Sequence, residues 1–173
     1  MNFIFIPGNS KQNKSWIKQV KDEFSELYDK AEILEYNHWE TGENILDFEE
    51  ESQKLLKICE NFGPFNILAK SAGCLIALKL ISEGKIKPEE CLFIGFPLGF
   101  GRSLGLNIDL MLKNCKVPIL FIQKTQDPVM HSKELKKYLT ALGMTNYELK
   151  EIPGSEHHYE DIDLLKSSFT RSG

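Results

Sequence analysis

The feature that most constrains the fold is an alternation of short apolar runs with longer amphipathic stretches. The first run, Phe3-Ile4-Phe5-Ile6, is apolar throughout and ends at Pro7-Gly8, as is typical of a strand buried on both faces. The stretch that follows, residues 16–28, places apolar side chains at helical spacing among Lys and Glu. A chain that repeats this pattern predicts a parallel sheet with helices on both sides.

The pattern recurs to the end of the chain. Further strands are expected at residues 31–36, 65–69, 91–96, 117–122 and 147–152. Further helices are expected at residues 48–62, 74–81, 108–113, 133–142 and 161–169. Six βα units with short connections, and with no linker or internal repeat, predict a three-layer α/β/α sandwich around a mostly parallel six-stranded sheet. We expect a single domain over residues 1–173.

The composition indicates which kind of partner the protein is expected to bind. A chain of 173 residues can bury about 70% of its unfolded surface, so its core needs no metal or disulfide. The 21 Lys+Arg and 25 Asp+Glu residues include no concentrated basic stretch, which argues against nucleic-acid binding and favours a small-molecule partner. The four cysteines lie in or beside apolar runs without a C-x-x-C spacing and are interpreted as core thiols: Cys59, Cys74, Cys91 and Cys115.

The beginning of the sequence indicates in which cellular compartment the protein is expected. Met1 leads directly into the first apolar run, with no basic start and too few apolar residues for a signal sequence or a membrane span. We therefore expect a cytoplasmic protein that does not bind membranes.

In a parallel α/β sheet, ligands bind beyond the carboxyl ends of the strands. After the third expected strand comes Ala69-Lys70-Ser71-Ala72-Gly73, a small-x-Ser-x-small pattern typical of a nucleophile elbow. Small residues are needed two positions on either side of the serine because the sharp strand-to-helix turn brings the flanking backbone close. Ser71 as a simple helix N-cap explains the pentapeptide equally well.

Two other strand ends carry the residues that a nucleophilic serine needs. Asp127 follows the fifth expected strand, and Gly154-Ser155-Glu156-His157 follows the sixth. With Ser71, Asp127 and His157 in this order, the sequence resembles the α/β-hydrolase family, in its small single-domain serine hydrolase branch without a cap. The resemblance covers nearly the whole chain and implies the sheet order 2-1-3-4-5-6. Ala69 departs from the usual first glycine of the motif.

The resemblance also implies roles for these residues. Ser71 is the expected nucleophile, His157 the general base and acid, and Asp127 the group that orients the imidazole. The amides of Ala72 and Asn9 are the expected oxyanion donors. The implied activity is hydrolysis of a small ester, thioester or amide through an acyl-enzyme, with no cofactor and no metal.

The segment that carries the cap in larger relatives is short in this chain. Residues 97–114 have room for a loop and a helix but not for a full lid. The resemblance therefore implies an open, shallow pocket for an acyl substrate, and the expected edge residues are apolar: Leu98, Phe100, Leu104 and Leu106.

Two alternatives concern the histidines. A slip of one residue exchanges His157 and His158; otherwise His158 is expected at the rim of the pocket. A metal site built from His157, His158 and Asp161 has no familiar ligand spacing, because adjacent histidines in an extended segment point apart.

Other polar residues near the strand ends have structural interpretations. Lys70 is expected to point away from Ser71, and His131 to lie on the surface near a helix start. His38 and Trp39 are interpreted as residues of a loop that packs on itself.

Two other functions stay open at this point. The fold alone does not establish catalysis, so the chain is alternatively a catalytically weak hydrolase-like module that binds a partner. A flavodoxin-like phosphate or cofactor binder using Gly8-Asn9-Ser10 explains the sheet but leaves Asp127 and His157 unexplained.

Overall fold

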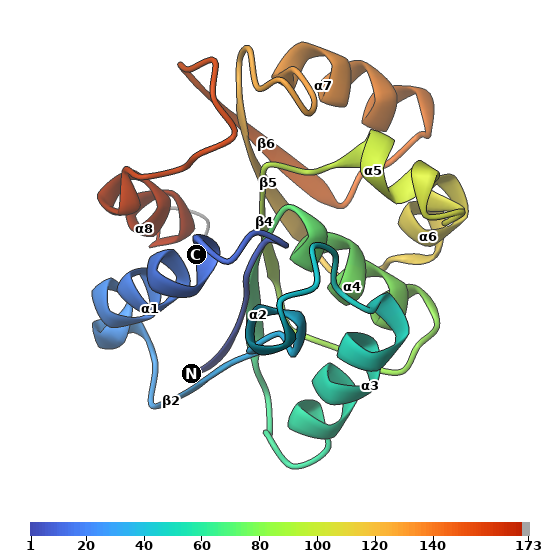
Figure 1. Ribbon diagram of the computed structural model, residues 1–173. Helices are drawn as coiled ribbons and strands as arrows, with labels where there is room; N and C mark the ends of the chain where they lie inside the picture. Colours follow the sequence, from blue (N-terminus) through green and yellow to red (C-terminus); the bar gives the residue numbers. More distant parts are fainter. Residues whose placement is uncertain (171–173) are drawn as a thin grey trace.

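The computed structural model describes residues 1–170, which form one six-stranded sheet with helices on both faces (Figure 1). The strands are β1 (Asn2–Ile6), β2 (Lys30–Ile33), β3 (Asn66–Lys70), β4 (Cys91–Ile94), β5 (Ile119–Lys124) and β6 (Tyr147–Ile152). All five strand pairings are parallel, and the order across the sheet is β2-β1-β3-β4-β5-β6. The predicted α/β class and the sheet order implied by the resemblance are both confirmed.

The helices divide between the two faces of the sheet. One face is covered by α1 (Asn13–Glu23) and α8 (Ile162–Thr170), on the left of Figure 1. The other face is covered by α2 (His38–Thr41), α3 (Phe48–Cys59), α4 (Ala72–Ser82), α5 (Leu98–Ser103), α6 (Ile108–Asn114) and α7 (Ser132–Ala141). The strands separate two hydrophobic clusters, because successive side chains of a strand point to opposite faces.

β1 illustrates this division. Phe3 and Phe5 are fully buried in the cluster on the α1/α8 face, and Ile4 and Ile6 are fully buried in the cluster on the other face. A strand that contributes to both cores must be apolar at every position, which explains the continuous run at the start of the sequence.

Element boundaries differ from the sequence prediction at several points. The helix expected over 16–28 ends at Glu23 and continues as a short 3₁₀ turn, Ser25–Leu27. The strand expected over 31–36 ends at Ile33, at the edge of the sheet. The single-turn α2 and the glycine-rich α5 lie where loops were expected, since neither has a stretch long enough to show helical periodicity.

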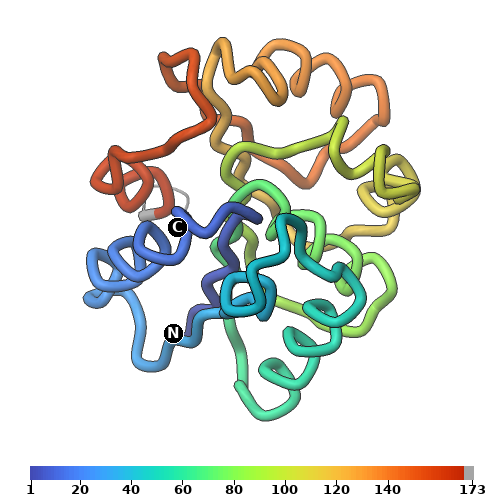
Figure 2. Tube along the Cα trace, viewed as in Figure 1, coloured from blue at the N-terminus to red at the C-terminus, as the bar shows by residue number. Residues whose placement is uncertain are grey.

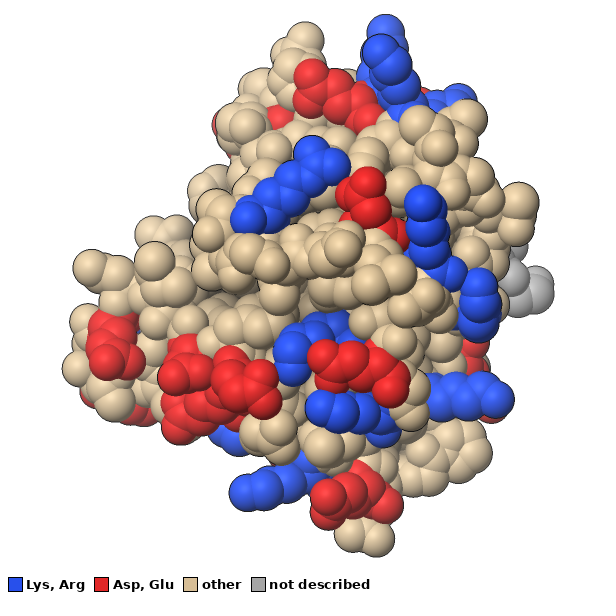
Figure 3. Space-filling view, turned by 90° about the vertical axis from the view of Figure 1, so that its right-hand side faces the viewer, with Lys and Arg blue, Asp and Glu red and all other residues tan. Residues whose placement is uncertain are grey.

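On the face turned toward the viewer in Figure 3, Lys and Arg side chains lie among Asp and Glu over the centre and right, and acidic side chains gather at the lower left. Within residues 1–170, no helix has both the length and the apolar character needed to cross a membrane. Cys74, Cys91 and Cys115 are buried thiols, whereas Cys59 is half-buried against the core.

Because every strand is parallel, the connections that follow β1, β3, β4, β5 and β6 all leave from the end of the sheet where the carboxyl ends of the strands lie (Figure 2). Gln123, fully buried near the end of β5, holds two of these connections together. Its Oε1 accepts from the Phe96 amide at 2.8 Å, and its Nε2 donates to the Met130 carbonyl at 2.7 Å. The fold therefore fixes the loops at the edge where the candidate residues lie.

Candidate active site

Ser71 occupies a strained turn between β3 and α4. Its φ of 49° makes it the only non-glycine residue with positive φ in the described chain. It stands at the N-cap of α4, but its hydroxyl makes no capping hydrogen bond there. The turn is held by the main chain, since the Ser71 amide donates to the Ile94 carbonyl at 2.9 Å and the Ser71 carbonyl accepts from the Cys74 amide at 2.9 Å. Such strain at a half-buried serine is typical of a functional site rather than of a simple cap.

Close backbone packing explains the small residues around the serine. A Cβ added to Gly73 falls 2.6 Å from the Pro7 carbonyl oxygen and 2.7 Å from that of Ile6, so only glycine fits there. Ala69 is completely buried in the sheet. Gly8, in the turn after β1, is also close to the serine, because a Cβ added there falls 3.4 Å from the Ser71 Cβ. The turn after β1 thus lies directly against the serine.

The Ser71 hydroxyl belongs to a hydrogen-bonded chain of three side chains. Ser71 Oγ lies 2.9 Å from His157 Nε2, and His157 Nδ1 lies 2.8 Å from Asp127 Oδ2 and 3.0 Å from Asp127 Oδ1. The three residues come from the connections after β3, β5 and β6, as the sequence predicted. His158, the alternative histidine, is exposed and forms none of these contacts.

Asp127 is fully buried and ionised. Burial opposes the charge, but hydrogen bonds from His157, Tyr159 and the Val129 amide outweigh it, and the pKa of Asp127 lies below its ordinary value. The ionised carboxylate accepts from Nδ1–H of His157, which leaves the Nε2 lone pair directed at the Ser71 hydroxyl. This arrangement fixes the tautomer that a general base needs.

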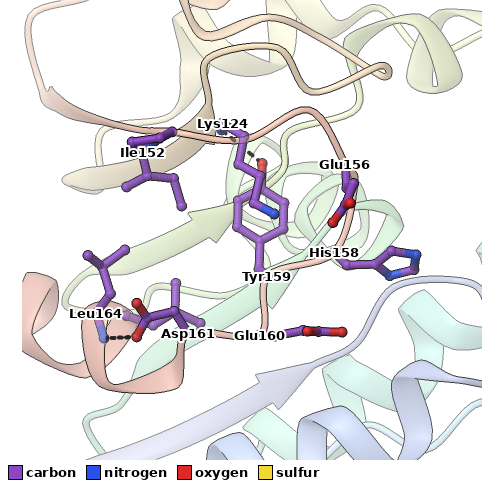
Figure 4. A pocket seen from close by; sticks show the side chains of 10 residues that line it. Lys124, Ile152, Glu156, His158, Tyr159, Glu160, Asp161 and Leu164 are labelled. Carbon is purple, nitrogen blue, oxygen red and sulfur yellow. Dashed lines mark hydrogen bonds between the residues drawn. The ribbon is translucent and has the colours of Figure 1, made fainter.

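Tyr159 is a further member of this network, and no sequence pattern indicated it. Its hydroxyl donates to Asp127 Oδ2 at 2.7 Å and accepts from the Lys124 amide at 3.1 Å, and burial raises the pKa of the phenol. Its ring meets the His157 ring edge-to-face, with centroids 6.2 Å apart. Figure 4 shows the Tyr159 ring at the centre of this region, with His158 turned away from it.

Gly95, just after β4, leaves room for the histidine. It has a φ of 62°, and a Cβ there falls 2.9 Å from His157 Cε1 and 3.0 Å from Tyr159 Cε2. A side chain at this position displaces the imidazole. The approach of the histidine loop to the sheet therefore depends on this glycine.

The Asn9 loop is held by a set of hydrogen bonds. Its carbonyl accepts from His38 Nε2 at 2.8 Å and from Trp39 Nε1 at 2.9 Å, and its side-chain oxygen accepts from the Leu46 amide at 2.8 Å. His38 and Trp39, expected to pack on their own loop, are buried and bind this turn instead. Among the hydrogen bonds of residues 1–170, the amides of Asn9 and Ala72 donate none.

A cavity of about 630 Å³ opens beside His157, between the start of α1 and the 157–160 loop. It is lined mainly by polar side chains: Ser10, Gln12, Asn13, Ser15, Trp16, Gln19, Lys70, His157, His158, Tyr159 and Glu160. Lys70 points to the α1 face, away from Ser71 as expected, yet it shares this cavity with His157. His158 is exposed where it lines this cavity, and it also lines a smaller one of about 220 Å³ to which Tyr159 contributes as well (Figure 4).

The apolar residues expected at the pocket edge belong to the α5 region. Leu98 is buried in the core and Phe100 is half-buried against it, next to α4. Leu106 also packs partly against this core, while Leu104 is 39% exposed. The cavity beside His157 is formed from other elements, so the expected acyl edge and this polar cavity are two different surfaces.

The remaining candidates have ordinary surroundings. His131 is exposed at the N-cap of α7. Cys74 is fully buried, and burial raises the pKa of its thiol, as suits a core residue. In the described part of the chain, no three His, Cys, Asp or Glu side chains gather closely enough to hold a metal ion.

Comparisons with known proteins bear on the fold. No family model matches the sequence, and no curated protein matches it significantly. Among solved structures, an uncharacterized protein from Bacillus cereus ATCC 10987 aligns with a TM-score of 0.75 and 17% identity over 98% of this chain. This chain spans 59% of that protein.

Two further structures are similar over almost the whole chain. An alpha-beta serine hydrolase homologue from Coxiella burnetii has a TM-score of 0.73 and 14% identity, over 99% of this chain and 84% of its own. Mouse alpha/beta hydrolase domain-containing protein 10 has a TM-score of 0.70 and 14% identity, over 99% of this chain and 88% of its own. These likenesses show that the chain has the α/β-hydrolase fold.

Proposed function

We propose that this chain, with its α/β-hydrolase fold, is a serine hydrolase that cleaves a small ester, thioester or amide through an acyl-enzyme on Ser71. The observation that carries the proposal is the continuous hydrogen-bonded chain from Ser71 Oγ through His157 to the buried, ionised Asp127. A serine hydroxyl is a weak nucleophile at neutral pH, and a histidine held in the correct tautomer is the base that activates it.

The reaction follows from these positions. Ser71 Oγ adds to the acyl carbon while its proton passes to His157 Nε2, and Asp127 stabilises the imidazolium. The amides of Asn9 and Ala72 are the donors for the developing oxyanion. The proton on Nε2 then passes to the leaving group as the acyl bond breaks. Water, activated by the same nitrogen, releases the acyl group from Ser71.

The experiment that tests the proposal is labelling of the purified protein with a fluorophosphonate probe, followed by mapping of the adduct by mass spectrometry. Labelling confined to Ser71, and abolished in Ser71→Ala, is the expected result. Circular dichroism of both proteins establishes that they are folded. A folded wild-type protein that does not react contradicts the proposal and favours a module that binds a partner.

A further inference from the structure

The cavity beside His157 contains a buried positive charge with no negative partner. Lys70 is 4% exposed, and Nζ donates to Asn13 Oδ1 at 2.6 Å. Within the described residues, Lys70 forms no ion pair; the Trp16 ring lies against the ammonium, 5.0 Å from Nζ to its centroid. An ammonium has three donors, and Asn13 accepts one. Among residues 1–170, the other two have no acceptor, and Lys70 lines the wall of the cavity.

The folded protein carries this buried charge at a cost in free energy. Burial lowers the pKa of Lys70 to about 8, although the negative charge of Asp127 counteracts part of the effect. Buried charges in proteins are normally paired or hydrogen-bonded on all sides. The other charged side chain of this cavity wall, Glu160, is exposed at the rim. The site therefore favours an anion that enters from solvent.

The position of the cavity identifies which part of a substrate reaches it. In the proposed reaction, His157 Nε2 delivers its proton to the leaving group, so the leaving group must lie next to His157. The cavity begins at His157 and extends to Lys70. The proposed oxyanion donors are the amides of Asn9 and Ala72, and neither residue lines the cavity, although Ser10, next to Asn9, does. A group bound in the cavity is thus on the leaving-group side of the scissile bond.

From this geometry we infer that the substrate carries a negatively charged group on its leaving alcohol, thiol or amine, and that the Lys70 ammonium binds this group. The inference rests on the proposed serine hydrolase function and specifies its substrate class. Lys70 keeps its proton throughout. The proton that moves is the one from Ser71, which passes through His157 to the leaving atom as the acyl bond breaks.

The test compares two acetate esters that differ only in charge, 3-acetoxybenzoate and 3-acetoxybenzamide. The measured quantity is the ratio of kcat/KM for the anionic ester to kcat/KM for the neutral one. Comparing this ratio between variants cancels the intrinsic reactivity of the two leaving groups. We expect Lys70→Met to lower the ratio about tenfold or more, the usual effect of losing a charge-assisted hydrogen bond.

Two other variants sharpen the result. Glu160→Gln removes a competing negative charge from the rim of the cavity and is expected to raise the ratio severalfold. Lys136→Met removes a lysine from the exposed surface of α7 and is expected to leave both rates unchanged. An unchanged ratio in Lys70→Met and Glu160→Gln contradicts the inference. Equal losses with both esters in Lys70→Met also contradict it, because Lys70 then acts on the reaction rather than on an anion.

The same series separates this inference from the proposed function. Phenyl hydrogen succinate carries its charge on the acyl side, and a larger effect of Lys70→Met on this ester refutes the leaving-group placement. If wild type hydrolyses no ester and Ser71 is not labelled, the proposed function fails. Binding of 3-hydroxybenzoate, measured by NMR titration with Ser71→Ala and with Ser71→Ala/Lys70→Met, still reports on the anion site. Equal binding by these two variants overturns it.

Discussion

The buried charge of Lys70 destabilises the folded protein at neutral pH. Its pKa is about 8 in the folded protein and 10.5 at the ordinary value. One pKa unit corresponds to about 1.4 kcal/mol, so carrying this charge in the folded state costs about 3 kcal/mol at low pH. Replacement by methionine, which keeps the length and removes the charge, is therefore expected to stabilise the protein at neutral pH.

The direction in which this penalty changes with pH follows from proton linkage. Between about pH 8 and 10.5 the unfolded chain holds a proton at Lys70 that the folded chain has released, so wild-type stability gains with rising pH. The penalty is fully present below pH 8 and absent above pH 10.5. The stability advantage of Lys70→Met over wild type is then expected to shrink by about 2.5 kcal/mol between pH 7 and pH 10.

A second effect of the substitution does not depend on pH in this way. Lys70→Met leaves Asn13 Oδ1 without its donor, which costs about 1–3 kcal/mol at a buried position. The absolute advantage at pH 7 is accordingly about 0–2 kcal/mol. The change of the advantage with pH isolates the charge from the lost hydrogen bond.

Urea denaturation of both proteins at pH 7, 8, 9 and 10 measures this change, with Lys136→Met as the control for net charge. All other groups titrate in both proteins and cancel in the difference. A difference between Lys70→Met and wild type that stays constant from pH 7 to pH 10, beyond the change in the control, refutes the reasoning.

Four further outcomes test the site itself. Asp127→Asn is expected to lower kcat about 10³-fold or more through the wrong imidazole tautomer of His157, measured with a neutral ester; unchanged turnover moves the acid elsewhere. Tyr159→Phe removes a hydrogen bond to the buried carboxylate and is expected to lower the free energy of unfolding by about 1–3 kcal/mol, read from urea midpoints; an unchanged midpoint is the contrary result. Gly95→Ala is expected to slow fluorophosphonate labelling at least about tenfold, because the new Cβ collides with His157. Trp39→Phe breaks one hydrogen bond to the Asn9 loop and is expected to slow labelling severalfold with little loss of stability, and an unaltered rate excludes that positioning role.

The residues that the sequence predicts best are those fixed by their place after a strand. Ser71, Asp127 and His157 each follow a strand, and parallel strands bring those ends to one edge. Local pattern and topology together suffice to bring the three side chains near each other. The positive φ of Ser71 was not predicted, although it fits the sharp strand-to-helix turn that the small flanking residues indicated.

Residues whose contacts depend on how loops pack could not be predicted in the same way. Tyr159 lies two residues beyond His157, and nothing in a single sequence indicates that its hydroxyl turns back to Asp127. α2 is one turn long, too short to show a period, yet it brings His38 and Trp39 to the Asn9 carbonyl. These contacts arise only after the loops are placed on the sheet.

Lys70 lies between these two cases. Alternation along β3 places Leu68 with the α1/α8 cluster and Ala69 with the opposite one, so Lys70 turns toward α1 by parity. The alternation along the strand does not reveal that the 157–160 loop lies on the same side, where Lys70 and His157 line one cavity.

The stability penalty of the Lys70 charge and its proposed recognition of an anion can be measured separately. Together, the two measurements distinguish a functional charge from a structural one. A lysine that only tethers Asn13 makes one hydrogen bond, and such a bond to a charged group contributes about 1–3 kcal/mol against a penalty of about 3 kcal/mol. The tether alone therefore at most matches the penalty, whereas an anion entering the cavity adds the missing opposite charge. If Lys70→Met shows the expected pH-dependent advantage and loses the preference for the anionic ester, the penalty and the recognition come from the same charge. If the advantage appears without any change of preference, the ammonium is a cost without a ligand, and the leaving group bound beside His157 is neutral.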